Sequence, residues 1–529
     1  MPSESPTPVE AEAGAMPADD GFGFHDEENL RPAAPDAAQC GPKQQVKRVH
    51  LWARPFPLED GDLLPQSEDR QGEVATATEA NSDGDQYGSR RGRLCYVSAG
   101  RKAKKEILAC TIGKDDLMPA LLNHRGLYRL PWTLPDNAIS WLEPTSACNL
   151  YCDGCYRKND PDSHKSLEQV RKELDIFNRL RNTDGVSIAG GDPLMHPQIE
   201  KIVEMIAADG QKPIINTNGL WLTKEKLVAL KKAGVAGFTF HIDSKQQRPH
   251  MKGKTEIELN ELRLQYARML AEVGDISCAF NATVYEDTLK DVPEVVAWGQ
   301  KHIDIVHILV FIAFRGGSMR KGYDYLVGGK KIDMAPLPYA IHEERQISIM
   351  STDVVETICS RYPDFQPSAY LNGTERPDHF KWLLTTRIGT KDKIFGYTGP
   401  KFMELSQTFH HLLNGSYLAY TKPKVHGRGK SMLLLAPFDK GLRRTALAYL
   451  HDAARSPALL FRKLHMQSIM IIQPADFTRS GALSMCDGCP DITVWEDRLV
   501  WSCRMEELIN FGDWVRAVPT NGDPNASKP

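Results

Sequence analysis

The stretch 143–156 reads Glu-Pro-Thr-Ser-Ala-Cys-Asn-Leu-Tyr-Cys-Asp-Gly-Cys-Tyr and follows a short apolar run that is typical of a buried strand. Three and then two residues separate its cysteines, Cys148, Cys152 and Cys155. Three thiolates on one loop can bind three irons of a four-iron, four-sulfur (4Fe-4S) cluster. Because the loop has no fourth thiol, one iron would stay open to a small molecule. The spacing therefore predicts a metal site that carries out chemistry.

The triplet taken alone also fits a purely structural role. A zinc knuckle, or three unrelated buried thiols, would account for it, because a reduced protein often uses cysteine as a small apolar residue. Zinc normally takes four ligands, so a distant residue would have to join the three. In this alternative the chain is a non-catalytic zinc or iron–sulfur protein, a binding or redox-sensing module on an α/β scaffold.

The composition is that of an ordinary globular protein and sets the class. The chain has 529 residues, 41% hydrophobic and 25% charged, and a formal net charge of −3, so we expect several structural units and no nucleic-acid binding. Six of the eleven cysteines fall in two tight groups, which favours metal binding in a reducing compartment over disulfides. With neither a signal-like start nor a long apolar run, we expect a cytoplasmic location.

Apolar runs alternate with helical periodicity between residues 131 and 317, which we expect to form the core. This order predicts an α/β fold, a partial (β/α)6 TIM-like barrel, and barrel enzymes place chemistry at the carboxyl ends of their strands. The cysteine loop follows the first of these strands. The expected strands are 138–142, 186–189, 213–216, 237–242, 277–284 and 306–314, and the expected helices are 165–180, 198–208, 224–233, 256–273 and 292–301.

Additions flank this core on both sides. The first 40 residues contain nine acidic side chains and one arginine, which is typical of a disordered tail. The predicted additions are a disordered acidic tail (1–45), a small β-rich preface (46–130) with a flexible segment near 64–92, a helical extension with a basic stretch (318–480), a cysteine-rich metal segment (481–518) and a disordered tail (519–529).

A second motif ends the second predicted strand, Gly190-Gly191-Asp192-Pro193. Two successive glycines let a backbone approach a ligand closely, and the proline stiffens the turn. A tight turn between a strand and a helix accounts for the motif equally well on its own.

Together the cysteine triplet and this turn resemble the radical SAM superfamily. The resemblance implies that the open iron chelates S-adenosylmethionine (SAM) and that reduction gives a 5'-deoxyadenosyl radical. It also implies that residues 190–193 hold the SAM ammonium as the family's Gly-Gly-Glu-Pro motif does, with Asp192 one methylene shorter than the usual glutamate. Many members have an aromatic residue before the third cysteine, where this chain has Gly154. Tyr156 or Tyr151 then becomes the candidate for packing against adenine.

Polar residues follow two further strands. Asn218 comes after the third strand, and Asp243 and Ser244 come after the fourth. In a barrel these ends face the cluster, so the three side chains are candidates for contacts with the SAM ribose or carboxylate. Helix capping and turn formation are the competing interpretation for these residue types.

The C-terminal segment holds a second group of thiols, Cys486, Cys489 and Cys503. It resembles a reduced form of the SPASM or twitch auxiliary-cluster domains of radical SAM enzymes, which implies a second iron–sulfur cluster. Zinc completed by a histidine is the alternative, because ligand type alone does not separate the two metals. Cys359 is a possible fourth ligand, although nothing in the sequence places it there.

The resemblance implies a radical SAM enzyme that abstracts hydrogen from an unactivated C–H bond. A peptide or protein fits the auxiliary-cluster resemblance as substrate, a lipid-like molecule fits the basic stretch, and flavodoxin or ferredoxin is the expected electron donor. Residues 421–470 contain ten Lys or Arg and two Asp among apolar runs. Such a segment predicts peripheral contact with an anionic membrane or, alternatively, a solvated helix face packed on the barrel.

Overall fold

The computed structural model describes residues 122–314, 317–318, 323–341, 349–375, 379–477 and 483–519. All of them belong to one of the two units into which the chain divides, and the other unit, residues 25–111, has no described residue. The predicted acidic tail and nearly all of the predicted preface and of the predicted C-terminal tail (519–529) therefore lie outside the described residues.

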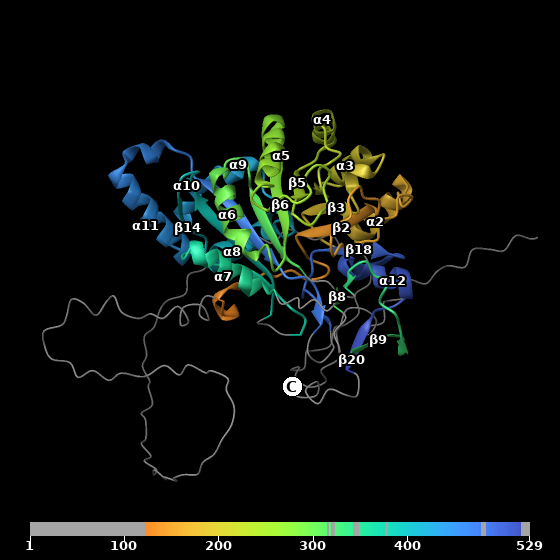
Figure 1. The fold of residues 1–529 in the computed structure, drawn as a ribbon. Coiled ribbons are helices and arrows are strands. Elements are labelled where there is room, and N and C mark those ends of the chain that lie inside the picture. Colours follow the sequence, from red (N-terminus) through yellow and green to blue (C-terminus); the bar gives the residue numbers. More distant parts are fainter. Residues whose placement is uncertain are drawn as a thin grey trace, which may run out of the picture. The chain divides into compact units, whose positions relative to one another are not determined.

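Six parallel strands lie side by side in chain order and form one side of the main sheet (Figure 1). Each overlaps a strand expected from the sequence, so the partial α/β barrel is confirmed. The sheet is open along the described residues, with β2 at one end and β1 at the other. The six are β2 (Ile139–Thr145), β3 (Gly185–Gly190), β4 (Lys212–Thr217), β5 (Gly237–His241), β6 (Ser277–Val284) and β7 (Ile308–Ala313).

Helices connect these strands as the periodicity predicts. Ser166 caps the first of them through a capping box with Gln169, and Thr223 caps the third. Gly234, at φ +107°, ends that third helix in the left-handed conformation that favours glycine. The five helices are α2 (Leu167–Leu180), α3 (Ile199–Ala208), α4 (Lys224–Ala233), α5 (Asn260–Val273) and α6 (Val292–Lys301).

The main sheet continues beyond the barrel strands, which corrects the prediction of a helical extension over 318–480. Four strands of that segment join the sheet: β15 pairs in parallel with β7, β13 pairs antiparallel with β15, and β12 and β14 pair with β13. Their pattern is hard to recognise because β13, although buried on both faces, contains Lys381 and Arg387 and therefore shows no continuous apolar run. These four strands are β12 (Ala369–Asn372), β13 (Phe380–Gly389), β14 (Ile394–Tyr397) and β15 (His465–Ile472). A fifth added strand, β1 (Tyr128–Arg129), precedes the barrel in the chain and pairs with β12.

The same segment also contributes helices. Helix α11 (Lys440–Arg455) is followed by the 3-10 turn η6 (Pro457–Phe461), which begins at a proline. The segment also contains α7 (Ser351–Arg361), α8 (Pro400–Asn414), α9 (Pro423–His426), α10 (Gly429–Met432) and η5 (Leu433–Leu435). The helical elements elsewhere in the described chain are α12 (Met505–Phe511), η2 (His124–Gly126), η3 (Pro193–Met195), η4 (Leu289–Asp291) and η7 (Ser502–Arg504).

Short strands outside the main sheet complete the described fold. The hairpin of β18 and β19 packs beside β2, at the open end of the barrel (Figure 1). The short strands are β8 (Gly317–Ser318), β9 (Tyr323–Val327), β10 (Lys330–Lys331), β11 (Ala340–Ile341), β16 (Asp476–Phe477), β17 (Leu483–Ser484), β18 (Ile492–Trp495), β19 (Arg498–Trp501) and β20 (Arg516–Pro519).

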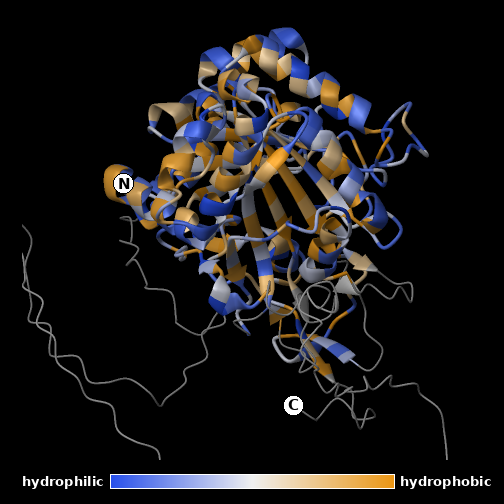
Figure 2. Cartoon of the chain, turned by 90° about the vertical axis from the view of Figure 1, so that its left-hand side faces the viewer, coloured by the Kyte–Doolittle hydropathy of each residue, from blue (hydrophilic) through white to orange (hydrophobic). Residues whose placement is uncertain are grey.

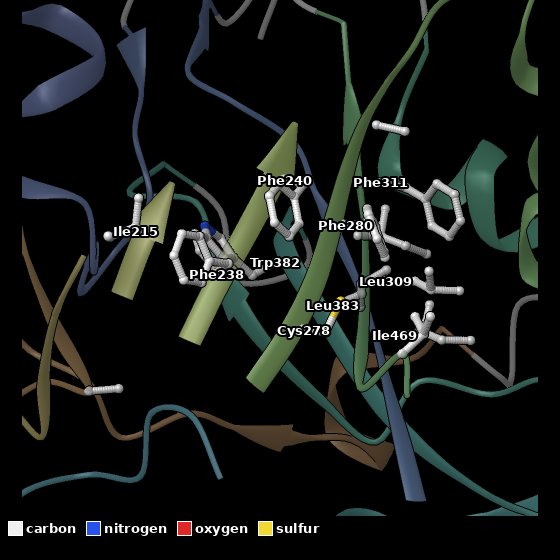
Figure 3. Close-up of a cluster of buried hydrophobic side chains, with 14 of the residues drawn as sticks. Ile215, Phe238, Phe240, Cys278, Phe280, Leu309, Phe311, Trp382, Leu383 and Ile469 are labelled. Atoms are coloured by element: carbon white, nitrogen blue, oxygen red, sulfur yellow. The ribbon is translucent and has the colours of Figure 1, made fainter. Parts of the chain in front are cut away.

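One apolar core runs through the barrel strands and the added strands. Phe240 of β5 stacks on Phe280 of β6 with ring centroids 5.7 Å apart, and Trp382 of β13 and Ile469 of β15 belong to the same buried cluster (Figure 3). The extension therefore shares its core with the barrel. Among the described helices, none combines the length and the apolar character that crossing a membrane requires.

Candidate functional site

The cysteine loop leaves the end of β2 and lies directly against the end of β3. Gly191 N donates to Thr145 O at 2.9 Å, and Asp192 N donates to Ala147 O at 2.8 Å. A Cβ atom on Gly191 would lie 2.2 Å from Ala147 O, and Gly190 has φ +105°. The glycine pair is therefore needed for the close approach of two backbones, and it fixes the start of the cysteine loop.

The far side of the loop contacts the ends of β6 and β7. The Tyr285 hydroxyl donates to Asp153 O at 3.3 Å, and the rings of Tyr285 and Phe314 pack with centroids 4.7 Å apart. A Cβ atom on Gly154 would lie 2.2 Å from the Phe314 ring. The space beside the third cysteine is therefore filled by an aromatic ring from the end of β7, which explains why this position is a glycine here.

The three thiols lie half-buried on this loop. Burial raises the pKa of Cys148, Cys152 and Cys155, and Asp243 adds to the effect at Cys152. Asn218 Nδ2 lies 3.8 Å from Cys148 Sγ, so this predicted residue does meet the triplet. Within the described ranges, no three His, Cys, Asp or Glu side chains are grouped around a position for a single metal ion.

Asp192 is buried, and its carboxylate accepts hydrogen bonds from other residues of the protein. Its oxygens accept hydrogen bonds from Thr217 Oγ1 at 2.8 Å, Asn218 N at 2.9 Å and Leu194 N at 2.9 Å. Burial raises the pKa of Asp192 in spite of these donors. The side chain thus joins the ends of β3 and β4 and caps η3, which begins at Pro193. Direct contact between Asp192 and SAM stays a prediction.

Asp243 and Ser244 lie in the loop after β5. His241 Nε2 lies 2.8 Å from an Asp243 oxygen, and Lys245 N donates to the other at 2.9 Å. Burial acts to raise the pKa of Asp243, but these hydrogen bonds and the His241 charge outweigh it and hold that pKa below its usual value. Ser244 Oγ is buried with no hydrogen-bond partner among the described residues.

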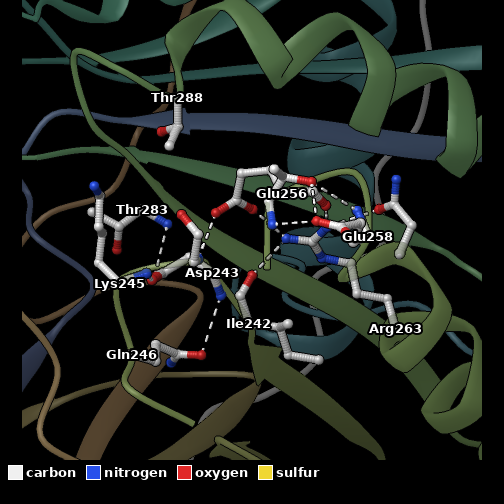
Figure 4. Close-up of polar contacts among 12 residues, drawn as sticks. Ile242, Asp243, Lys245, Gln246, Glu256, Glu258, Arg263, Thr283 and Thr288 are labelled. Carbon is white, nitrogen blue, oxygen red and sulfur yellow. Dashed lines mark hydrogen bonds and ion pairs between the residues drawn. The ribbon is translucent and has the colours of Figure 1, made fainter. Parts of the chain in front are cut away.

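A buried ion pair from α5 supports this loop (Figure 4). Arg263 donates to Glu256 Oε2 at 2.6 Å and to Ile242 O at 2.7 Å, while Glu256 Oε1 accepts from Ser244 N at 2.6 Å. Arg263 is fully buried, and its other amino group donates to Glu256 O at 2.8 Å and to Asn260 Oδ1 at 2.7 Å, so protein acceptors compensate its charge. The ion pair therefore fixes the backbone of Asp243 and Ser244.

Sequence reasoning missed Arg248, which follows in the same loop. Its Nη2 donates to Asn218 O at 2.8 Å and to His241 O at 2.7 Å, and its Nη1 has no hydrogen bond within the described part of the chain. Arg248, Asp243 and Ser244 line a pocket of about 300 Å³. A lone arginine in a polar loop gives no sequence signal of this role.

Tyr156 and two buried charges connect the cysteine loop to β2. The Arg157 guanidinium lies 5.0 Å from the Tyr156 ring centroid, and its Nε donates to Glu143 at 2.5 Å. Ser502 Oγ donates to the same carboxylate at 2.7 Å. Glu143 did carry a signal, because an acidic side chain inside an apolar strand needs a buried partner. Packing of Tyr156 against adenine stays a prediction.

The C-terminal thiols lie together beside the β18–β19 hairpin. A hydrogen bond between the Cys486 and Cys489 thiols lowers the pKa of Cys486, and burial raises the pKa of Cys503 to about 12. Asp491 carries a buried Oδ1 with no hydrogen-bond partner among the described residues, and burial raises its pKa to about 7. Cys359 is not brought to this group, since it lies on α7 and its thiol donates to Phe365 O.

Comparison with known proteins identifies the core. Residues 142–299 match the family model of the radical SAM superfamily. The match begins in β2 and ends in α6, so it contains the first cysteine triplet, the glycine turn and the pocket. Residues 142–299 are therefore a radical SAM domain, and the C-terminal cysteines lie outside the match.

Several characterised proteins are similar to parts of the chain. An AdoMet-dependent heme synthase from Oleidesulfovibrio alaskensis is 25% identical over 174 residues, 31% of this chain and 44% of the relative. The antilisterial bacteriocin subtilosin biosynthesis protein AlbA from Bacillus subtilis is 33% identical over 94 residues, 17% of this chain and 20% of the relative.

A solved structure with partial similarity is that of Streptococcus suis SuiB bound to precursor peptide SuiA. It is 16% identical, with a TM-score of 0.32 over 46% of this chain and 48% of SuiB. The chain thus spans less than half the length of each of these three relatives.

Proposed function

We propose that the chain is a radical SAM enzyme in which Cys148, Cys152 and Cys155 ligate a 4Fe-4S cluster. The observation that carries the proposal is the position of the three-thiol loop, which rests on the ends of β3, β6 and β7 and adjoins a polar pocket. Ligands of a cluster bind separate irons, so the thiols need not converge on one point. With the cluster and SAM bound, reductive cleavage of SAM supplies a 5'-deoxyadenosyl radical that abstracts hydrogen from an unactivated C–H bond.

The pocket after β5 fits the amino-acid end of SAM. Ser244 Oγ and Arg248 Nη1 are buried donors that lack hydrogen bonds among the described residues, and a carboxylate would satisfy both. Asp243 beside them suits an ammonium group, because its hydrogen bonds keep it ionised. Asp192 and the glycine pair are proposed to act without contacting SAM, by holding the strand ends and the cysteine loop in place.

For the substrate we propose a peptide or protein side chain. The Bacillus subtilis relative is a biosynthesis protein of the bacteriocin subtilosin, which supports this class. A lipid-like substrate is the second candidate, favoured by exposed apolar side chains such as Leu447 and Phe461 within the basic stretch 421–470. The cluster must be reduced in either case, so a flavodoxin or ferredoxin is the proposed electron donor.

We also propose a second metal centre, preferably a 4Fe-4S cluster, at Cys486, Cys489 and Cys503. The three thiols and Asp491 are close enough for their charges to act on one another, and the Asp491 carboxylate keeps one buried oxygen without a hydrogen bond among the described residues. A carboxylate can serve as a metal ligand, so Asp491 is the proposed fourth ligand.

Formation of 5'-deoxyadenosine tests the main proposal. The full chain is reconstituted anaerobically with iron and sulfide, reduced with dithionite and given SAM, and the product is measured by chromatography. We expect the triple variant of Cys148, Cys152 and Cys155 to alanine to remain folded and to form no product, because it lacks the cluster ligands. Cys359→Ala, a thiol on α7, is the matched control and should keep wild-type activity.

Two results would contradict the proposal. Undiminished 5'-deoxyadenosine from the triple variant would exclude these cysteines as cluster ligands. Zinc in place of iron in the reconstituted wild-type chain, together with unchanged spectra on addition of SAM, would favour the non-catalytic metal protein.

A further inference from the structure

Helix α11 has apolar side chains on two faces, only one of which is buried. Leu442, Tyr449 and Ala453 form the buried stripe, and the helix packs on β14. Leu447 and Leu450 lie on the other face, 63% and 57% exposed. A helix that only covers the sheet needs one apolar stripe, so covering the sheet does not account for the second stripe.

Neighbouring turns extend this exposed apolar face. The turns η5 and η6 both pack against α11, and Lys430 Nζ donates to Leu460 O at 2.6 Å, which ties α10 to η6. Large apolar side chains that are between 50% and 90% exposed form the α11 surface; they are Leu434, Phe438, Leu447, Leu450, Leu460 and Phe461. Figure 2 turns the side that carries α11 toward the viewer and shows orange residues among blue ones on its helices.

The α11 surface is surrounded by positive charge. Residues 428–463 contain eight Lys or Arg and only two acidic side chains, Asp439 and Asp452. Asp439 is buried, where it caps α11 and accepts hydrogen bonds from the backbone of α8, and Asp452 pairs with Lys393 at 2.5 Å. Both carboxylates are therefore engaged within the fold. Arg462 pairs with Asp392 at 3.0 Å, and the other seven basic residues of this segment leave it with a net positive charge.

We propose that the α11 surface docks on an anionic lipid bilayer. Exposed leucine and phenylalanine side chains on a helix, rimmed by Lys and Arg, are typical of helices that lie in the interface plane of a membrane. The 16-residue α11 fits that geometry and is too short to span a bilayer. Charge complementarity selects anionic lipid, because each basic residue near such a surface adds attraction. The proposal is independent of the radical chemistry.

Helix α8 offers an internal comparison within the same chain. Its Phe409 and Leu412 are 64% and 76% exposed, as apolar as the α11 residues. Its only Lys or Arg is Lys401, which pairs with Glu404 at 2.6 Å. An apolar face without cations should bind a bilayer weakly, so α8 serves as the control for exposure alone.

Flotation with vesicles tests the proposal on the full chain. We expect the protein to float with phosphatidylcholine vesicles that contain phosphatidylglycerol, to stay behind with pure phosphatidylcholine, and to dissociate at high salt. Replacing Arg443, Arg444, Arg455 and Lys463 with glutamine should reduce binding at least about tenfold. A second variant, Leu447→Ser with Phe461→Ser, should reduce it as well, whereas Phe409→Ser with Leu412→Ser should leave it unchanged.

Three outcomes would overturn the proposal. The first is a wild-type chain that stays with the unbound protein at low salt. The second is a Leu447→Ser, Phe461→Ser variant that binds like the wild type, because the apolar contact would then be absent. The third is a concentration-dependent dimer in solution that this variant abolishes, which would make the surface an interface between copies. Thermal unfolding of each variant shows that the fold is intact.

Discussion

Two buried histidines illustrate how strongly single residues depend on the fold. The rings of His307 and His426 stack with centroids 4.6 Å apart, and His307 Nδ1 accepts a hydrogen bond from Cys278 N at 2.9 Å. Burial lowers the pKa of His307 to about 3 and that of His426 to about 4, and His465 near by adds to both shifts. Both rings are therefore neutral in the folded chain at every pH above about 5.

This neutrality predicts a loss of stability in acid. In the unfolded chain a histidine has a pKa of about 6.5, so the unfolded state binds more protons once the pH falls below that value. Between about pH 6 and pH 4, each of the two histidines should lower the free energy of unfolding by about 1.4 kcal/mol per pH unit. We expect His307→Asn, which keeps an acceptor for Cys278 N, to remove one such contribution.

Urea denaturation at several pH values measures the effect as the difference between the variant and the wild type. His451→Asn, at an exposed histidine, is the control for the replacement of a histidine by asparagine. An identical pH dependence in His307→Asn would show that the pKa of His307 does not differ between the folded and the unfolded chain, which would contradict the prediction.

At the scale of elements, the contact between the cysteine loop and β3 depends on the absence of one side chain. A Cβ atom at position 191 would lie 2.2 Å from Ala147 O and 2.4 Å from Ser146 O, both of them backbone atoms that cannot move alone. We expect Gly191→Ala to displace the loop, to cost about 1–3 kcal/mol of stability and to lower the iron retained after reconstitution. Iron per chain and thermal unfolding measure both effects.

The matched control is Gly427→Ala. The nearest atom to a Cβ atom there lies 3.8 Å away and the backbone φ is −79°, so alanine should fit without strain. Full iron retention in Gly191→Ala would mean that the loop does not rest on β3 as the structure has it.

How far the sequence predicts the structure also differs between elements. The barrel strands were predictable because parallel strands buried on both faces appear as apolar runs, and the helices between them have capping residues such as Ser166 and Thr223. Strand β13 was not predictable, because it contains Lys381 and Arg387. Their charged groups are buried and donate hydrogen bonds to Pro474 O and Val296 O, which are distant in sequence. Arg248 was missed for the same reason, since its role arises from how its loop folds onto two strand ends.

At the scale of the whole molecule, the two cysteine groups are joined although more than 300 residues separate them. Arg157, two residues after Cys155, donates to Glu143 and to Ser502 O, and Ser502 precedes Cys503. The next residue, Lys158, donates its backbone N–H to Glu506 Oε1 of α12 at 3.1 Å. Removing one partner of a buried ion pair is costly, so these contacts hold the C-terminal segment firmly against the radical SAM domain.

This arrangement allows the second metal centre to be tested without disturbing the first. Replacing Cys486, Cys489 and Cys503 with alanine leaves Arg157, Glu143 and Ser502 in place, so the variant should stay folded. If the second centre is a 4Fe-4S cluster, iron per chain should fall from about eight to about four. Asp491→Ala should lose iron from the same centre only, because its carboxylate is the proposed fourth ligand. Asp487→Ala, at a half-buried neighbour whose carboxylate pairs with Arg129 at 2.6 Å, should lose none. A loss of zinc with constant iron would identify a structural zinc site, and constant iron and zinc in the triple variant would show that these thiols are not ligands.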